Sequence, residues 1–75
     1  MSKPPQVRPK DLVKALQKAG FVKARQTGSH VYLKHPDGRL TSVSVHPGTV
    51  PSGTMRAILE QTHLTADKLK KMLNF

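Results

Sequence analysis

Histidines are the side chains of this sequence best suited to acid–base chemistry, because an imidazole titrates near neutral pH. They occupy positions 30, 35, 46 and 63. His30 stands out because it follows Gly28 and Ser29 and opens the strand-like run HVYLKH. Every second side chain of an extended strand faces the same way, so Tyr32 and Lys34 share the face of His30. Such a histidine can transfer protons, contact a ligand or simply occupy the surface of a sheet.

Other kinds of catalytic site find little support in the sequence. A metal site is not expected, because no two histidines have the spacing of ligands on one helix face and only 4 carboxylates are present. The chain has no cysteine, and its aspartates fall in predicted turns or at helix ends, which argues against a Ser-His-Asp triad. No glycine-rich phosphate loop is present either. We therefore expect neither a metal nor a cofactor.

The composition favours a polyanionic partner. Lys and Arg number 13 against 4 Asp and Glu, which gives a formal charge of +9 in 75 residues. A bias of this size points to nucleic acid, an acidic protein or an anionic membrane, although solubility alone is the alternative explanation. The apolar runs are far too short to span a membrane, and the N-terminus lacks an apolar leader segment. The sequence thus predicts a cytoplasmic protein.

The N-terminal part is predicted to be a flexible tail over residues 1–8, followed by a single domain over residues 9–75. Pro9 suits the first turn of a helix that Gly20 ends. Within this helix, Leu12, Val13, Leu16 and Ala19 recur at helical spacing and form an apolar stripe. A basic ridge with the spacing i, i+4 and i+8 lies away from this stripe. It consists of Lys10, Lys14 and Lys18.

The rest of the chain predicts three strands and two helices. The strands cover residues 21–26, 29–35 and 40–45, and Asp37-Gly38 is a hairpin turn signal. The next helix is expected to be capped by Ser52 or Thr54, and a short last helix by Thr65.

Alternation within the strands separates two faces of the predicted sheet. One face enters the core with Val31, Leu33, Val43 and Val45. The other face is polar and carries His30, Tyr32, Lys34, Ser42, Ser44 and His46. The expected fold is α+β, an α-β-β-β-α two-layer sandwich like a double-stranded-RNA-binding domain, with an extra short C-terminal helix. The polar face of its sheet stays open.

Four segments of the sequence resemble the HicA family of toxins from prokaryotic toxin–antitoxin pairs. The segments are LVKALQKAGF at residues 12–21, Gly28-Ser29-His30, His35-Pro36-Asp37-Gly38, and GTMRAILEQ at residues 53–61. Each segment is a weak signal by itself. Their occurrence together, in this order and spacing from Pro9 to about Thr65, makes the resemblance fairly specific.

The resemblance implies an endoribonuclease of double-stranded-RNA-binding type fold that cleaves messenger RNA. It also implies that His30 is the catalytic residue and that a HicB-type antitoxin binds the toxin and masks this histidine. Many members carry a second histidine or polar residue directly after the catalytic one, whereas this chain has Val31. If proton transfer in the family uses that neighbour, this chain needs another group, a water or the substrate in its place.

Residues around His30 have functional interpretations that rest on alternation alone. Lys34 can clamp a phosphate, Tyr32 can stack on an unpaired base, and His46 is the only other histidine placed on that face. Ser29 can orient His30 or bind a phosphate, and Gly28 can supply a turn with positive φ. Ordinary structural roles stay open for all of them, as does a merely solvated role for the basic ridge.

Three functions are consistent with these observations. The leading one is a metal-independent ribonuclease toxin, and the second is a non-catalytic module that binds double-stranded RNA. The third is a protein that chiefly binds an acidic partner. Turnover of RNA separates the first from the others. The free chain is expected to be a monomer.

Overall fold

A computed structural model of the chain describes residues 6–73. Its elements follow in the order α1 (Pro9–Lys18), β1 (Val22–Thr27), β2 (His30–Lys34), β3 (Leu40–Ser44), α2 (Ser52–Thr62) and α3 (Ala66–Leu73). This order and the three-stranded antiparallel sheet confirm the predicted α+β fold of the double-stranded-RNA-binding type, with its additional C-terminal helix. Residues 1–5 and 74–75, which belong to the predicted tail and domain end, lie outside the described residues.

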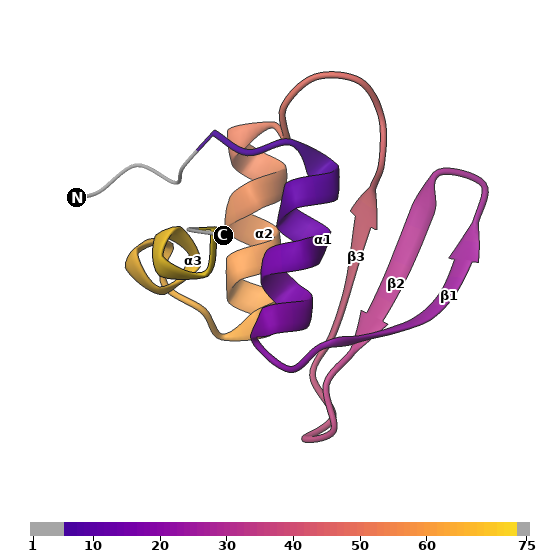
Figure 1. Cartoon of the computed structure of the whole chain (residues 1–75), viewed down its shortest axis with the longest axis vertical. Coiled ribbons are helices and arrows are strands. Elements are labelled where there is room, and N and C mark those ends of the chain that lie inside the picture. Colours follow the sequence, from indigo (N-terminus) through magenta and orange to yellow (C-terminus); the bar gives the residue numbers. More distant parts are fainter. Residues whose placement is uncertain (1–5, 74–75) are drawn as a thin grey trace.

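The sheet has the order β1-β2-β3, so β2 is its central strand. In Figure 1 the three helices lie to one side of the sheet, and β1 is the strand farthest from them. Every residue of β1 is exposed, whereas β2 and β3 bury alternate residues. One face of the central and third strands is therefore covered by helices, and the other face is open.

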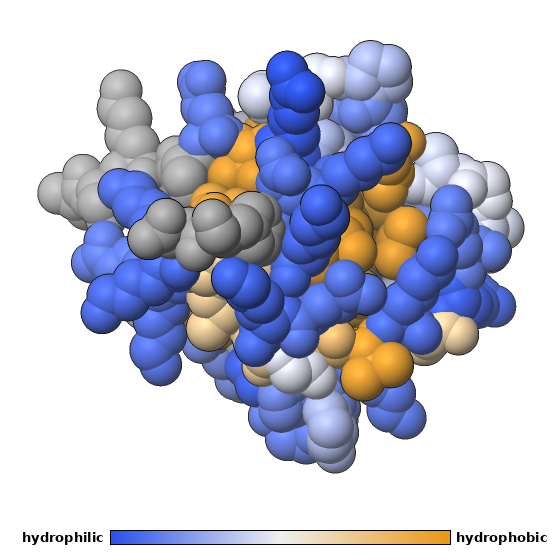
Figure 2. All heavy atoms as spheres, viewed as in Figure 1, coloured by the Kyte–Doolittle hydropathy of each residue, from blue (hydrophilic) through white to orange (hydrophobic). Residues whose placement is uncertain are grey.

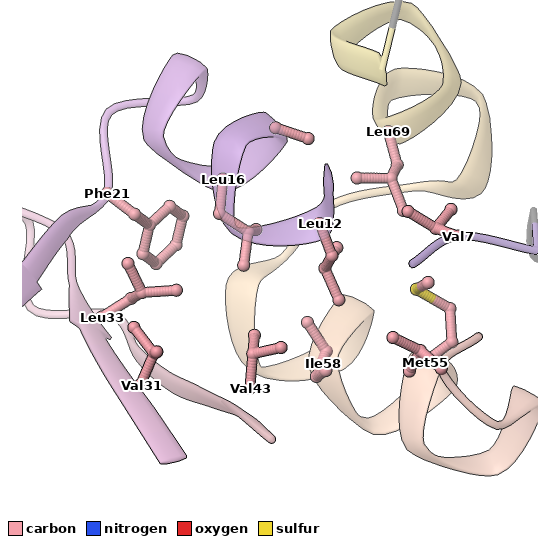
Figure 3. Close-up of a cluster of buried hydrophobic side chains, with 12 residues drawn as sticks. Val7, Leu12, Leu16, Phe21, Val31, Leu33, Val43, Met55, Ile58 and Leu69 are labelled. Atoms are coloured by element: carbon pink, nitrogen blue, oxygen red, sulfur yellow. The ribbon is translucent and has the colours of Figure 1, made fainter. Parts of the chain in front are cut away.

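The core lies between the covered face of the sheet and the helices. Val31, Leu33 and Val43 point from the sheet into this core, as alternation predicted (Figure 3). Val45 is half-buried at its edge. Burial of such a side chain stabilises the fold by about 1.5–3 kcal/mol. The other buried apolar residues are Val7, Leu12, Ala15, Leu16, Phe21, Val50, Met55, Ile58 and Leu69.

The structure departs from the predicted tail at Val7, which belongs to the core. The side chain of Val7 is only 6% exposed, and its carbonyl accepts a hydrogen bond of 2.8 Å from the backbone N–H of Val50. Figure 3 places Val7 beside Leu69 of α3. Since α3 packs against α1 and buries Leu69 fully, segments from both ends of the chain close the core. A lone valine between polar residues has no periodicity, so alternation and helical spacing did not reveal it.

The helix ends follow most of the predicted signals. Pro9 occupies the first turn of α1, and the hydroxyl of Thr65 accepts a hydrogen bond of 3.1 Å from the backbone N–H three residues later, which confirms the predicted cap of α3. The predicted cap of α2 is wrong. Pro51 is its N-cap residue, and no side chain caps this end. Ser52 and Thr54 fail as caps because both already lie within the helix.

The predicted Asp37-Gly38 turn joins β2 to β3 and is tied to α2. Gly38 has a φ of +100°, and its N–H donates to the carbonyl of His35 at 2.9 Å. The Arg39 guanidinium donates both to the Asp37 carboxylate, at 2.8 Å, and to the carbonyl of Thr62 at the end of α2. The backbone N–H of Arg39 also donates to the carboxylate at 3.0 Å, and it is the main cause that lowers the pKa of Asp37.

Gly20 ends α1 in a conformation that only glycine adopts without strain. Its φ is +102°, and an added Cβ would lie 2.8 Å from Nε2 of His35. Gly20→Ala is therefore expected to lower the free energy of unfolding by about 1–3 kcal/mol, measured by urea titration. In the control Gly53→Ala, within α2, the new Cβ meets nothing within 4 Å, and stability should be unchanged or higher by up to about 1 kcal/mol. Equal stability of the two variants would contradict this account.

Candidate functional site

His30 lies at the start of the central strand, on the open face of the sheet. Its side chain is exposed, and it is paired with Thr27 of β1 on one side and with Ser44 of β3 on the other. Directly opposed residues of antiparallel strands point to the same face. The imidazole is thus flanked by two hydroxyl-bearing side chains, on the face where alternation predicted it.

Gly28 and Ser29 form the two-residue loop that joins β1 to β2 and delivers His30. Gly28 has a φ of +56°, and a positive φ at the first of two loop positions favours glycine. The carbonyl of Ser29 accepts a hydrogen bond of 2.6 Å from the backbone N–H of Val45, which ties the loop to the end of β3. Among the described residues, no hydrogen bond joins the Ser29 hydroxyl to His30. This segment therefore positions His30 through the backbone.

The imidazole of His30 is open to solvent and to a ligand. Among the described residues its one ring neighbour is Tyr32, with ring centroids 6.4 Å apart and an angle of 28° between the planes. Within residues 6–73, no side chain forms a hydrogen bond or an ion pair with His30. Both ring nitrogens can therefore meet a substrate, and no carboxylate fixes which of them carries the proton.

Arg25 of β1 also lies on the open face, next to Tyr32, which sequence reasoning did not predict. Its Cα pairs with that of Tyr32, and its Cζ lies 4.7 Å from the centroid of the Tyr32 ring. The pairing register shifts between Lys23 and Arg25, so Ala24 is the extra residue of a β-bulge. Strict alternation from the buried Phe21 would have put Arg25 on the covered face. The bulge instead turns Arg25 to the open face.

A comparison with protein families bears on this arrangement. The model of the HicA toxin of bacterial toxin–antitoxin systems matches residues 9–64, which include all three strands and the Gly28-Ser29-His30 segment. The match covers well over half of the chain. The chain belongs to the HicA toxin family. No individual curated protein matches it. The predicted resemblance is confirmed, and α3 lies beyond the matched residues.

In this HicA-family chain, Lys34 does not lie next to His30. The two residues stand at opposite ends of β2, which in an extended strand are roughly 13 Å apart. Lys34 pairs instead with Val22 and Leu40, whose side chains are 61% and 62% exposed. The open face thus has two different ends, one with hydroxyl-bearing residues around His30 and one with exposed apolar residues around Lys34.

His46 lies beyond the end of β3, in a groove that His30 does not line. Its Nδ1 is 2.9 Å from the carbonyl oxygen of Pro47. The groove has a volume of about 750 Å³, and its lining includes His46, Arg8, Lys10 and Asp11. Because β3 ends at Ser44, alternation does not extend to His46, and the structure groups it with the start of α1 instead.

The predicted basic ridge lies on α1, in the helical layer. Its three lysines, Lys10, Lys14 and Lys18, are all exposed. Figure 2 shows that hydrophilic side chains cover most of the surface in this view, with small hydrophobic patches between them. The ridge is therefore accessible to a polyanion, but it does not share the open face of the sheet with His30.

Two further findings concern other kinds of site. Within residues 6–73, no group of three or more His, Asp or Glu side chains could hold a metal ion. None of the described helices is long and apolar enough to cross a membrane.

Proposed function

We propose that this HicA-family toxin is a metal-independent endoribonuclease that cleaves messenger RNA, with His30 as its catalytic residue. One observation carries the proposal: His30 stands exposed on the open face of the sheet, with both ring nitrogens accessible, directly after the Gly28-Ser29 loop. An imidazole in this setting suits proton transfer to or from a bound substrate.

The proposed reaction is attack by a ribose 2′-hydroxyl on the adjacent phosphorus. The 2′-oxygen–phosphorus bond forms as the bond from phosphorus to the 5′-oxygen breaks, which leaves a 2′,3′-cyclic phosphate and a 5′-hydroxyl. His30 takes the proton from the 2′-hydroxyl or gives one to the departing 5′-oxygen. A water, or another group of the site or the substrate, completes the second transfer, since residue 31 is a valine.

Basic residues around the molecule are proposed to hold the RNA backbone. Lys34 on the open face, His46 at the groove and the ridge of Lys10, Lys14 and Lys18 are all exposed, and each can contact phosphates. Gly28 has open space around its Cα, and the Gly28-Ser29 loop is proposed to let the RNA backbone approach His30 closely. Tyr32 supports this part of the site, next to the imidazole.

The partner of the toxin is proposed to be a HicB-like antitoxin that covers His30. Membership of a toxin–antitoxin family implies an antitoxin partner, which supports this proposal. The open face would bind RNA in the free toxin and the antitoxin in the inhibited complex. We place the activity in the cytoplasm, where messenger RNA is found, and expect the free toxin to be a monomer.

The proposal is tested by incubating the purified chain with a long single-stranded RNA in the presence of a chelator. Repeated turnover is expected, with 5′-hydroxyl and 2′,3′-cyclic phosphate ends. The same RNA with 2′-O-methyl groups is expected to bind without being cut, because its nucleophile is blocked. Cleavage of the methylated RNA would exclude the proposed attack.

The alternative function is a non-catalytic module that binds double-stranded RNA, which the fold alone would permit. Tight binding of RNA without turnover under the same conditions would favour this alternative. Salt dependence does not separate the two, because both neutralise phosphates.

A further inference from the structure

Three side chains form a row across the open face of the sheet, from β1 to the central strand. The Arg25 guanidinium lies over the Tyr32 ring at 4.7 Å, and the Tyr32 ring lies beside that of His30 at 6.4 Å. Tyr32 is half-buried, whereas the two flanking residues are exposed. The Tyr32 ring therefore contacts a guanidinium and neighbours an imidazole.

The Arg25 charge has no acidic partner in the part of the chain that the structure describes. Its one described contact is with the face of the Tyr32 ring. A guanidinium that stacks on an aromatic ring keeps the N–H groups at its edge for a planar or bidentate acceptor. Phosphate oxygens are such an acceptor, and they also supply the missing negative charge.

We propose that Arg25, held by Tyr32 on the same open face as His30, is a phosphate-binding group that stabilises the charge developing on the phosphoryl oxygens during cleavage. This inference rests on the proposed ribonuclease function. It gives Arg25 the role of a cation, for which sequence alternation offered only Lys34. Lys34 is less suited, because it stands at the far end of β2 between two exposed apolar side chains.

The same geometry changes the role of Tyr32. The guanidinium covers one face of its ring, so that face is closed to a stacking base. Tyr32 is thus a positioning residue for Arg25. Its ring matters for this role and its hydroxyl does not, because the contact is made with the ring.

The test compares variants of Arg25 and Tyr32 with a control of equal charge. Arg25→Ala is expected to lower kcat/KM for RNA about 100-fold or more, mainly through kcat, as for loss of one group that stabilises transition-state charge. Arg25→Lys should recover part of the loss. Tyr32→Phe should remain close to the wild type, and Tyr32→Leu should be intermediate. Lys71→Ala removes the same charge from α3, and it should change kcat little.

A binding measurement makes the outcome independent of cleavage. The binding constant K for 2′-O-methyl RNA falls as the salt concentration rises. In Arg25→Ala the negative slope of log K against log salt concentration should become less steep by about 0.7, the value for one phosphate contact on a single strand. If the wild type binds but never cuts, the ribonuclease proposal fails while this slope still tests the phosphate site. If the wild type cuts, and Arg25→Ala matches Lys71→Ala in both kcat and slope, the role of Arg25 is overturned.

Discussion

His30→Ala is expected to fold and to bind RNA, and to cleave it about 10²–10⁴ times more slowly than the wild type. The reason is that a positioned acid or base contributes this factor, and the substitution removes the only imidazole of the central strand. The measurement is the initial rate on a long single-stranded RNA in the presence of chelator. Circular dichroism and thermal melting check the fold, and little change is expected because His30 is exposed.

A second histidine variant is the control for a contaminating nuclease and for the loss of any histidine. His63 follows α2 with a φ of +56°, a conformation that asparagine tolerates. His63 adjoins Thr62, whose carbonyl binds Arg39 beside the β2–β3 turn, whereas His30 is at the opposite end of β2. His63→Asn should therefore cleave like the wild type. If His30→Ala also cleaves like the wild type, another residue or a contaminating nuclease performs the reaction.

Phe21→Ala is expected to have the largest effect on stability, a loss of about 3–5 kcal/mol in the free energy of unfolding. Its ring is 2% exposed, contacts the His35 ring edge-on at 5.1 Å, and lies 5.1 Å from Cζ of Arg39. The substitution leaves a cavity in the core. It also removes the ring that contacts His35 and Arg39 beside the β2–β3 turn. A domain of this length has a total stability of roughly 4–11 kcal/mol, so the loss is a large share of it.

The neighbouring residue supplies the control for Phe21. Val22 is apolar as well, but its side chain is 61% exposed. Val22→Ala is expected to change the free energy of unfolding by no more than about 0.5 kcal/mol. Urea denaturation followed by circular dichroism compares the two variants. A loss below about 1 kcal/mol for Phe21→Ala would mean that the ring is not part of the core.

Much of the fold could be predicted from the sequence, because particular residue types mark the ends of its helices and strands. Gly20 and the Asp37-Gly38 turn mark element ends that need special backbone angles. Alternation in β2 and β3 separated Val31 and Val43 from His30, since a strand with one covered face must follow a period of two. Together these signals predict that the imidazole lies on the open face of the sheet, where the structure places it.

The remaining features depend on single residues that carry no periodic signal. The bulge at Ala24 shifts Arg25 by one position, and a strand with both faces exposed offers no apolar pattern that would reveal such a shift. Val7 is one valine outside any repeating pattern. His46 follows the end of β3, where alternation no longer applies. In each case the three-dimensional pairing decides the environment, and the local sequence does not.

The packing of α3 against α1 bears on when the toxin becomes active. The first helix of the chain needs Leu69, near the end of the chain, to cover its apolar side. Residues 9–64, although they hold the whole matched family segment and the candidate site, would leave that side open to water. On the ribosome, the nascent polypeptide therefore cannot complete this core until α3 has been translated and has emerged from the exit tunnel. We therefore expect residues 9–64 to complete their fold only after α3 is available to pack against α1.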